Sequence, residues 1–232
     1  MGREINLLRA LPRKTMRNVA ARKATKAENR EIALKFGRAY FDGPREQGYG
    51  GYRYDGRWVP VARDIVAHFG LKPGDRVLDV GCAKGFLVKD LLAACPGLEV
   101  FGLDISEYAL MHCEPEVVGR LHLGGADHLA FPDGGFSAVL NINTVHNLDR
   151  DRCIMALREM ERLAPGRGFV QVDAYRTPEE KALFEGWMLT AKTYSTPEGW
   201  LATFAEAGYT GDYYWTILES DPEYTITDAA SS

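Results

Sequence analysis

The segment that most constrains the fold of this chain is residues 77–85, which read Val-Leu-Asp-Val-Gly-Cys-Ala-Lys-Gly. Apolar residues surround Asp79 and run into a glycine turn, and leucine and valine then recur at helical spacing. This order predicts a strand, a tight loop and a helix. At such a junction the backbone N–H groups of the first helical turn are free, and glycine lets a ligand approach the backbone closely.

A second apolar strand is predicted at residues 98–103, and it ends at Asp104. An acidic side chain at the end of the second strand is placed to accept hydrogen bonds from the hydroxyls of a ribose. The glycine loop and Asp104 together therefore predict a cofactor that contains a nucleoside.

The length and composition fit one globular domain with a sizeable core. No apolar run reaches the roughly 18–20 residues that span a bilayer, and arginines interrupt the N-terminus where a secretory signal would be apolar. The four cysteines form no Cys-x-x-Cys pair and the histidines are scattered, so we expect free thiols and no metal site. These features favour a cytoplasmic protein that does not bind a membrane.

Charge is distributed unevenly along the chain. Residues 1–63 hold 15 Lys and Arg against six Asp and Glu, whereas residues 64–232 hold 13 against 26. Such a basic arm either binds RNA or another anionic partner, or packs on the acidic remainder of its own chain or of a second subunit. An apolar stripe within the arm favours packing, so a homodimer is compatible with the sequence and nucleic acid is the less favoured partner.

Strands and helices alternate after residue 60, which predicts an α/β fold. We expect a Rossmann-like, mostly parallel sheet of about six to seven strands with helices on both faces. The expected strands are residues 76–80, 98–103, 119–123, 136–142, 168–174 and 212–219. The expected helices are residues 60–70, 85–94, 106–112, 150–163, 178–192 and 197–207, with further helices at 3–11 and within 14–41. Residues 1–59 then form a basic helical arm with a Tyr/Gly-rich lid loop, and residues 60–232 form the α/β domain.

The lid loop, residues 42–58, is the least regular segment, with five glycines and four large aromatic residues. Dense glycine disfavours a helix or strand, and the aromatic residues argue against a solvated linker. A loop that covers a ligand accounts for both facts, and a loop packed on the core is the alternative. The residues that we expect to line a substrate pocket are Tyr49, Tyr52, Tyr54, Trp58 and, opposite them, Tyr175.

Three motifs occur in an order and spacing that resemble one known family. Residues 77–85 are followed by Gly102-Leu103-Asp104-Ile105-Ser106, and then by Gly125-Ala126-Asp127-His128 with a further strand behind it. Over roughly residues 60–219 this series resembles the class I methyltransferases that use S-adenosylmethionine, above all their small-molecule branch. The resemblance implies S-adenosyl-L-methionine as cofactor, a small-molecule methyl acceptor, and a methyltransferase domain at residues 60–232.

The resemblance also implies roles for individual residues. Asp79 and the glycine loop would hold the methionine part of the cofactor, Asp104 the ribose, and Asp127 the adenine amino group. Arg63 could pair with the cofactor carboxylate, because an Arg fork suits a carboxylate, although Arg57 competes for that role. The full set of expected cofactor-binding residues is Arg63, Asp79, Gly81, Cys82, Ala83, Gly85, Asp104, Ile105, Ala126, Asp127, His128 and Asn141.

One residue departs from the family pattern. Ala83 stands where the family usually has glycine, and we expect it to be accommodated with a negative φ. The same alanine argues against a nicotinamide dehydrogenase, whose Gly-x-Gly-x-x-Gly fingerprint lets a pyrophosphate approach. A carboxylate at Asp79 also suits a cationic sulfonium better than a pyrophosphate.

Methyl transfer from a sulfonium is a direct displacement, so the protein must mainly align the nucleophile and exclude water. If a base takes part, His146 is the first candidate, because it follows the fourth expected strand and its ordinary pKa suits proton removal near neutrality. Asp173 is the second candidate, and a local packing role is the alternative for both. Aromatic hydroxyls and acids around the pocket favour methylation of a nitrogen or oxygen on a polar small molecule, such as a sugar, an aminocyclitol or a nucleoside-like metabolite.

Two other functions stay open. An RNA methyltransferase would use the basic arm, but the acidic residues 64–232 do not continue a basic track. A non-catalytic protein would instead hold the cofactor as a structural or regulatory ligand.

Overall fold

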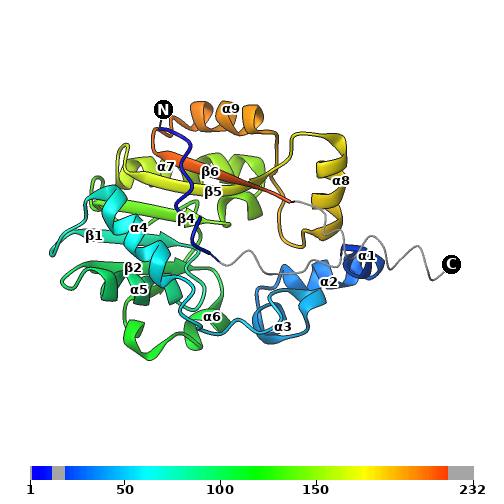
Figure 1. Cartoon of the computed structure of the whole chain (residues 1–232), viewed down its shortest axis with the longest axis horizontal. Helices are drawn as coiled ribbons and strands as arrows, with labels where there is room; N and C mark the ends of the chain where they lie inside the picture. Colours follow the sequence, from blue (N-terminus) through cyan, green and yellow to red (C-terminus); the bar gives the residue numbers. More distant parts are fainter. Residues whose placement is uncertain (1, 12–18, 219–232) are drawn as a thin grey trace.

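The computed structural model describes residues 2–11 and 19–218. Within them, six parallel strands form one sheet in the order β3-β2-β1-β4-β5-β6 (Figure 1). The strands are β1 (Arg76–Val80), β2 (Glu99–Asp104), β3 (Leu121–Leu123), β4 (Ala138–Ile142), β5 (Gly168–Ala174) and β6 (Asp212–Ile217). The predicted Rossmann-like α/β fold is therefore confirmed.

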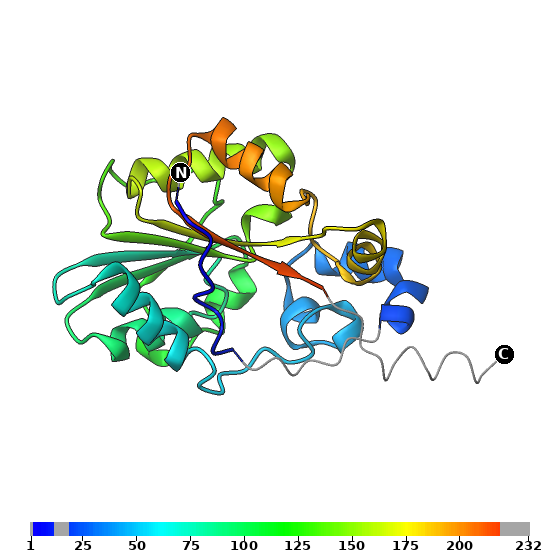
Figure 2. The ribbon, with the colours of Figure 1, turned by 45° about the horizontal axis from the view of Figure 1, so that its top comes forward.

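Helices cover both faces of the sheet, as Figures 1 and 2 show. On one face α4 (Val59–Phe69) and α5 (Phe86–Ala94) pack their apolar sides against β1 and β2, with Ile65 and Leu91 fully buried. On the other face α7 (Arg150–Leu163) and α9 (Pro197–Ala207) bury Leu157 and Trp200 against β4 and β5. Strands buried on both sides account for the continuous apolar runs that the sequence shows.

The strand order reverses next to β1, and this reversal positions the site. β1 pairs with β2 on one side, where Asp79 lies opposite Gly102, and with β4 on the other, where Val80 lies opposite Asn141. In sheets of this kind, ligands bind beyond the carboxyl ends of the strands at such a switch point. The loops after β1, β2 and β4 meet there.

The arm lies beyond the same carboxyl ends. Its helices α1 (Val19–Ala24), α2 (Lys26–Ala33) and α3 (Arg38–Asp42) lie at the same end of the molecule as α8 (Pro178–Trp187), and α1 packs beside α8 (Figures 1 and 2). Arg22 is buried, donates to the Trp187 carbonyl at 3.2 Å and stacks on the Trp187 ring. Arg30 donates to the carbonyls of Leu189 and Ala191 at 2.7 and 3.1 Å. These arginines of the arm thus bind backbone carbonyls of their own chain.

Two expected helices differ from the structure. Residues 3–11 do not form a helix; instead Ile5 donates its N–H to the Tyr213 carbonyl at 2.9 Å, and Tyr213 donates to the Arg3 carbonyl. This segment therefore runs beside β6 and inserts Leu7 into the core. The helix expected at 178–192 ends at Trp187, because residues 188–193 turn back and bind α2 and His146.

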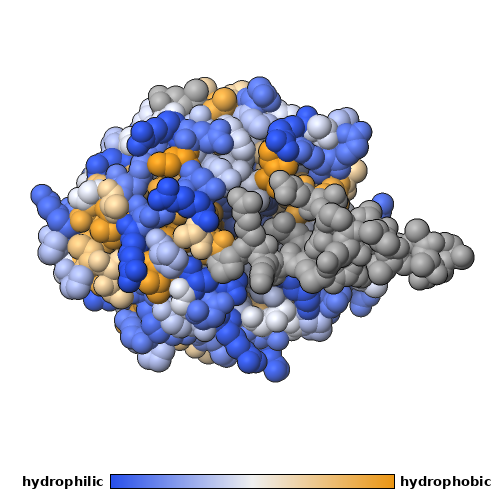
Figure 3. Space-filling view, in the orientation of Figure 1, coloured by the Kyte–Doolittle hydropathy of each residue, from blue (hydrophilic) through white to orange (hydrophobic). Residues whose placement is uncertain are grey.

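The expected helices within 14–41 are α1, α2 and most of α3; residues 14–18 of that range, like residue 219 of the last expected strand, fall outside the described residues. Shorter elements are α6 (Glu107–Met111) and the 3₁₀ turns η1 (Arg45–Gln47), η2 (Pro115–Val117) and η3 (Val145–Asn147). The face drawn in Figure 3 is mainly hydrophilic, with separate small apolar areas. No helix within the described residues is long and apolar enough to cross a membrane.

Candidate active site

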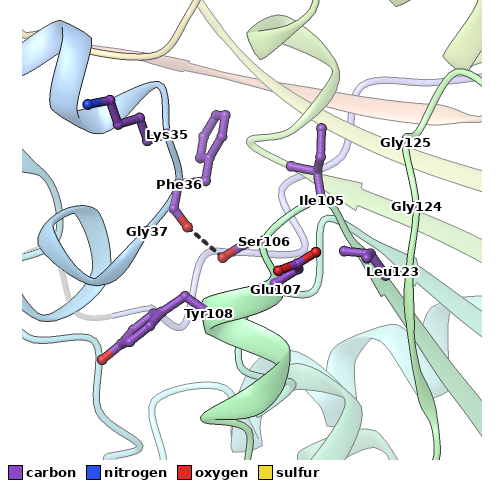
Figure 4. Close-up of a pocket in the computed structure, with 10 residues that line it drawn as sticks. All are labelled: Lys35, Phe36, Gly37, Ile105, Ser106, Glu107, Tyr108, Leu123, Gly124 and Gly125. Atoms are coloured by element: carbon purple, nitrogen blue, oxygen red, sulfur yellow. Dashed lines mark hydrogen bonds between the residues drawn. The ribbon is translucent and has the colours of Figure 1, made fainter.

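Two neighbouring cavities open at the carboxyl ends of β1, β2 and β4. The inner cavity, of about 110 Å³, lies between the arm and the loops that follow these strands. The outer cavity, of about 480 Å³, lies between the arm and the start of α6 (Figure 4). Both are lined by Phe36, Ile105, Gly124 and Gly125, so they meet at these residues.

Asp79 lies near the end of β1, two residues before Gly81, and does not itself line either cavity. Its side chain is buried, and no hydrogen-bond donor of the described residues reaches its carboxylate. Burial, together with the negative charge of Asp104, raises the pKa of Asp79 to about 7. An unpartnered buried carboxylate is costly in the protein alone, which indicates that a cationic or hydrogen-donating ligand completes it.

Asp104 ends β2 and is held from both sides. Its Oδ2 accepts the N–H of Ala83 at 2.8 Å, and its Oδ1 accepts the N–H of Ser106 at 2.8 Å. Burial raises its pKa although these hydrogen bonds act in the opposite direction. Each carboxylate oxygen can still accept a second hydrogen bond, so the two hydroxyls of a ribose can be bound here.

The expectation of a negative φ at Ala83 is wrong, because its φ is +50°. The turn keeps the left-handed backbone that glycine normally supplies, and in this turn the Ala83 N–H donates to Asp104. Gly81 has a φ of +87°, and a Cβ there would collide with Thr144. Gly85 has a φ of +76° and precedes α5, while the Cys82 thiol is buried and burial raises its pKa. Gly81 and Ala83 line the inner cavity, so the backbone of this loop borders the space that a ligand can occupy.

The loop after β3 supplies the side of the cavity next to Ile105. Ala126 lines the inner cavity, and His128 is exposed. Asp127 forms a bidentate ion pair with Arg152, at 2.6 and 3.0 Å, which lowers the pKa of Asp127. Arg152 itself lines the cavity. The ion pair fixes the orientation of the Asp127 carboxylate.

The end of β4 contributes two buried amide atoms without partners. Asn141 accepts the Val145 N–H at 3.0 Å through Oδ1, but its Nδ2 has no hydrogen-bond partner in the structure. Asn147 lines the inner cavity and donates Nδ2 to the Asn143 carbonyl, and its buried Oδ1 has no partner either. Together with Asp79, these atoms show that the residues present fit a polar, partly cationic nucleoside cofactor.

The lid loop is fastened to the glycine loop by a set of hydrogen bonds that we call the latch, formed by Asp42, Tyr52, Lys84 and Tyr108. The buried Lys84 donates to both oxygens of Asp42 at 2.9 and 2.7 Å and to the Tyr52 carbonyl at 2.9 Å. Tyr108 donates its hydroxyl to Asp42 at 2.7 Å, and the Tyr52 N–H also donates to Asp42. These bonds lower the pKa of Asp42, so the carboxylate stays charged.

The five residues predicted to bind substrate lie in different places. Tyr49 lines the inner cavity. Tyr52 stacks on Phe86 at 4.7 Å, and burial, followed by the negative charge of Asp79, raises the pKa of Tyr52. Tyr54 donates to Asp90 at 2.7 Å, on α5. Trp58 packs into the core beside α4, and Tyr175 contacts Tyr194. Tyr52, Tyr54, Trp58 and Tyr175 line neither of the two cavities.

His146 and Asp173, the first and second candidates for a base, lie beside each other, and neither of them lines one of the two cavities. The Asp173 N–H donates to His146 Nδ1 at 3.3 Å, and the Asp173 carboxylate lies 3.8 Å from the same nitrogen. Burial lowers the pKa of His146 below its ordinary value, and Asp173 acts in the opposite direction. A neutral ring that accepts at Nδ1 carries its proton on Nε2.

Arg63 is exposed on α4 and lines neither cavity. Several lining residues were not named individually from the sequence: Phe36, Tyr40, Phe41, Asn143, Thr144, Leu148 and Arg152. Asn143 and Thr144 directly follow a strand on the binding edge, which was the available signal. Phe36 and Arg152 carry no local signal, because only the tertiary structure brings them to the cavity.

The comparisons with known proteins agree with this geometry. Residues 77–168 match the family described as "Methyltransferase domain". A demethylmenaquinone methyltransferase of Symbiobacterium thermophilum is 31% identical over 162 residues, which cover 65% of this chain and 62% of that protein. A 2-methyl-6-phytyl-1,4-hydroquinone methyltransferase of Synechocystis is 27% identical and covers 63% and 52%. The chain thus spans about half to three fifths of the length of these relatives.

Among solved structures, the complex of the Haloferax volcanii Trm112 methyltransferase activator with a methyltransferase matches with a TM-score of 0.51 at 19% identity, covering 82% of this chain and 72% of that one. Geranyl diphosphate C-methyltransferase of Streptomyces coelicolor, solved with S-adenosyl-L-homocysteine, also gives 0.51, at 16% identity, covering 63% and 58%. Both likenesses support the fold. The chain contains a class I S-adenosylmethionine-dependent methyltransferase domain, and S-adenosylmethionine is the methyl donor of that family.

Proposed function

We propose that this protein transfers a methyl group from S-adenosylmethionine to a small molecule. The observation that carries the proposal is the buried Asp79 carboxylate without a hydrogen-bond donor, beside an Asp104 that is already oriented by two backbone N–H groups. The cofactor supplies an activated methyl group and a cationic amino-acid end. Asp79 and the Gly81–Gly85 loop bind that end, Asp104 holds the ribose, and Asp127 reads the base.

We further propose that the acceptor offers a nitrogen or oxygen nucleophile on a polar small molecule. Tyr49 on the lid side and Thr144 and Asn147 on the sheet side support this, because hydroxyl and amide groups can orient such a nucleophile. The relatives named above act on quinone-type substrates, so an apolar phenol is the competing acceptor. Alignment and exclusion of water by the lid supply most of the rate.

If a base takes part in the transfer, His146 is the first proposed candidate and Asp173 the second. His146 Nδ1 already accepts the Asp173 N–H, so proton removal would need the opposite tautomer or a turn of the ring. The direct check is the pH dependence of kcat for His146→Gln. A base role predicts a fall of about 100-fold or more and loss of the acidic limb of the profile; a variant that keeps the wild-type profile removes His146 from the chemistry.

The proposed function is tested with purified protein, methyl-labelled S-adenosylmethionine and a panel of polar amines, sugars and nucleosides beside simple phenols. Labelled product from the polar group supports the proposal. Turnover of phenols alone rejects the polar acceptor but keeps the enzyme class. Tight cofactor binding with no transfer to any acceptor favours the non-catalytic alternative.

An RNA methyltransferase is the alternative function, because the arm is basic. Titration of the protein with tRNA at several salt concentrations separates the two, since phosphate contacts weaken steeply with salt. We expect negligible binding, as Arg22 and Arg30 are engaged by their own chain. We also expect the protein to act in the cytoplasm, with its four cysteines as free thiols.

A further inference from the structure

Phe36 occupies an unusual position between α2 and α3. Its φ is +46°, a left-handed conformation that a large aromatic residue rarely adopts. Such strain persists only where the surroundings hold it, and it concentrates at ligand sites. The Phe36 N–H donates to the Ala33 carbonyl, and the Phe36 carbonyl accepts the Ser106 hydroxyl at 2.5 Å (Figure 4).

The anchor of this turn leads directly to the ribose-binding carboxylate. Ser106 accepts the Ala109 N–H through its hydroxyl and donates its own N–H to Asp104. The position of Phe36 is therefore set by the same residue that orients Asp104. A displaced Ser106 would move both.

The Phe36 ring faces an apolar side chain across the cavities. Ile105 follows Asp104 and is 56% exposed, although it is a large hydrophobic residue, and like Phe36 it lines both cavities. Figure 4 shows the two side chains standing on opposite sides of the space, with the backbone of Gly124 and Gly125 beside it. On its other side the Phe36 ring contacts Tyr40 edge-on at 5.3 Å, which limits its rotation.

A slot with an aromatic wall, an aliphatic wall and glycine backbone beside it suits a flat heteroaromatic base. Asp104, at one end of the slot, is where a ribose would be held. We propose that Phe36 stacks on the adenine of the cofactor against Ile105, so that the arm itself completes the nucleoside site and closes over it. This inference rests on the proposed function, because it takes S-adenosylmethionine as the ligand.

The test measures binding of S-adenosylhomocysteine by titration calorimetry. Loss of one stacked face should weaken binding by about 10- to 100-fold in Phe36→Ala and less in Phe36→Leu, which keeps the apolar wall and guards against misfolding. Phe131→Ala is the matched control, because Phe131 is a half-buried phenylalanine that lines neither cavity. Its affinity should equal that of the wild type.

A spectroscopic arm uses Phe36→Trp. A purine stacked on the new indole should quench its fluorescence relative to the wild type, and homocysteine, which lacks the base, should not. Failure of the wild type to bind would reject the proposed function itself. Binding by the wild type with unchanged affinity in Phe36→Ala, or unchanged cofactor affinity with a raised KM for the acceptor, would overturn the stacking role alone.

Discussion

Ala83 shows how one residue can carry backbone strain for a binding loop. Its φ of +50° lies in the left-handed region, which glycine would adopt without strain, and its N–H donates to Asp104. We expect Ala83→Gly to raise the free energy of unfolding by about 0.5–1 kcal/mol, because relieved strain exceeds the added entropy of the unfolded chain. Urea unfolding measures this change. The exposed helical Ala93→Gly is the control and should lose about 1 kcal/mol; a similar loss at Ala83 would contradict the account.

Asp79 makes the stability of the ligand-free protein depend on pH. Its pKa is raised from 3.8 to about 7 in the folded state, so the folded state binds the proton more tightly than the unfolded state. Below about pH 4 the Asp79 carboxyl is neutral in both the folded and the unfolded state. Above pH 7 it is ionised in both, and burying the charged carboxylate lowers the free energy of unfolding by up to about 4 kcal/mol. The contribution of Asp79 to the free energy of unfolding therefore falls as the pH rises from about 4 to about 7.

Asp79→Asn should remove this dependence. The variant without ligand should gain stability relative to the wild type between pH 4 and pH 8, as measured by urea unfolding at each pH. Wild-type affinity for S-adenosylmethionine should rise by up to about tenfold from pH 6 to pH 8, because only the ionised carboxylate attracts the cationic ligand. A stability difference that is the same at every pH would contradict the proposed burial cost.

At the scale of elements, the latch couples the lid loop to the turn after β1. Lys84 is buried and Asp42 is only partly exposed. Loss of one partner therefore leaves the charge of the other without an opposite charge beside it. We expect Asp42→Asn to cost about 1–3 kcal/mol and to speed amide hydrogen exchange across residues 36–52. The double variant with Lys84→Met should recover part of the loss.

The exposed pair Arg9–Asp64 is the control for the latch. Asp64→Asn should cost less than about 1 kcal/mol and leave exchange in residues 36–52 unchanged. Equal effects of Asp42→Asn and Asp64→Asn on that exchange would show that the latch does not hold the lid.

The elements that the sequence predicted well are those whose signal is local. β1, the glycine turn and α5 follow from apolar spacing and glycine, and Asp104 follows from its place after a strand. The helix predicted at residues 3–11 was wrong because this segment pairs with β6, some 200 residues away. Helical spacing in the sequence cannot reveal such a pairing. The predicted end of α8, at residue 192, was wrong because Arg30 binds the backbone carbonyls of Leu189 and Ala191, which follow the helix.

In the candidate site, too, features with a local sequence signal could be predicted and features that depend on the tertiary structure could not. The loop after each strand could be found from the order of motifs. Phe36, Tyr40 and Arg152 could not, because they reach the cavity only when the arm folds over the sheet edge and α7 packs beneath it. The positive φ of Ala83 could not be predicted from the local sequence, because the loop is held by the Asp104 carboxylate, which accepts the Ala83 N–H and lies 21 residues further along the chain.

At the scale of the whole molecule, a parallel sheet provides the carboxyl-end loops, and the basic arm closes over them. The acidic domain carries the buried carboxylates that a cationic cofactor requires. Arg22 and Arg30 of the arm bind backbone carbonyls at residues 187–191, while the exposed Arg9 pairs with Asp64. The uneven distribution of charge therefore does not by itself explain how the arm packs on the α/β domain.

The most direct test of this account is calorimetric titration of the wild type and Asp104→Ala with S-adenosylhomocysteine. We predict one site per chain with micromolar affinity, and a loss of about 100-fold or more in Asp104→Ala, since two charge-assisted hydrogen bonds to the ribose are removed. No binding to the wild type, or equal affinity in both proteins, would contradict it.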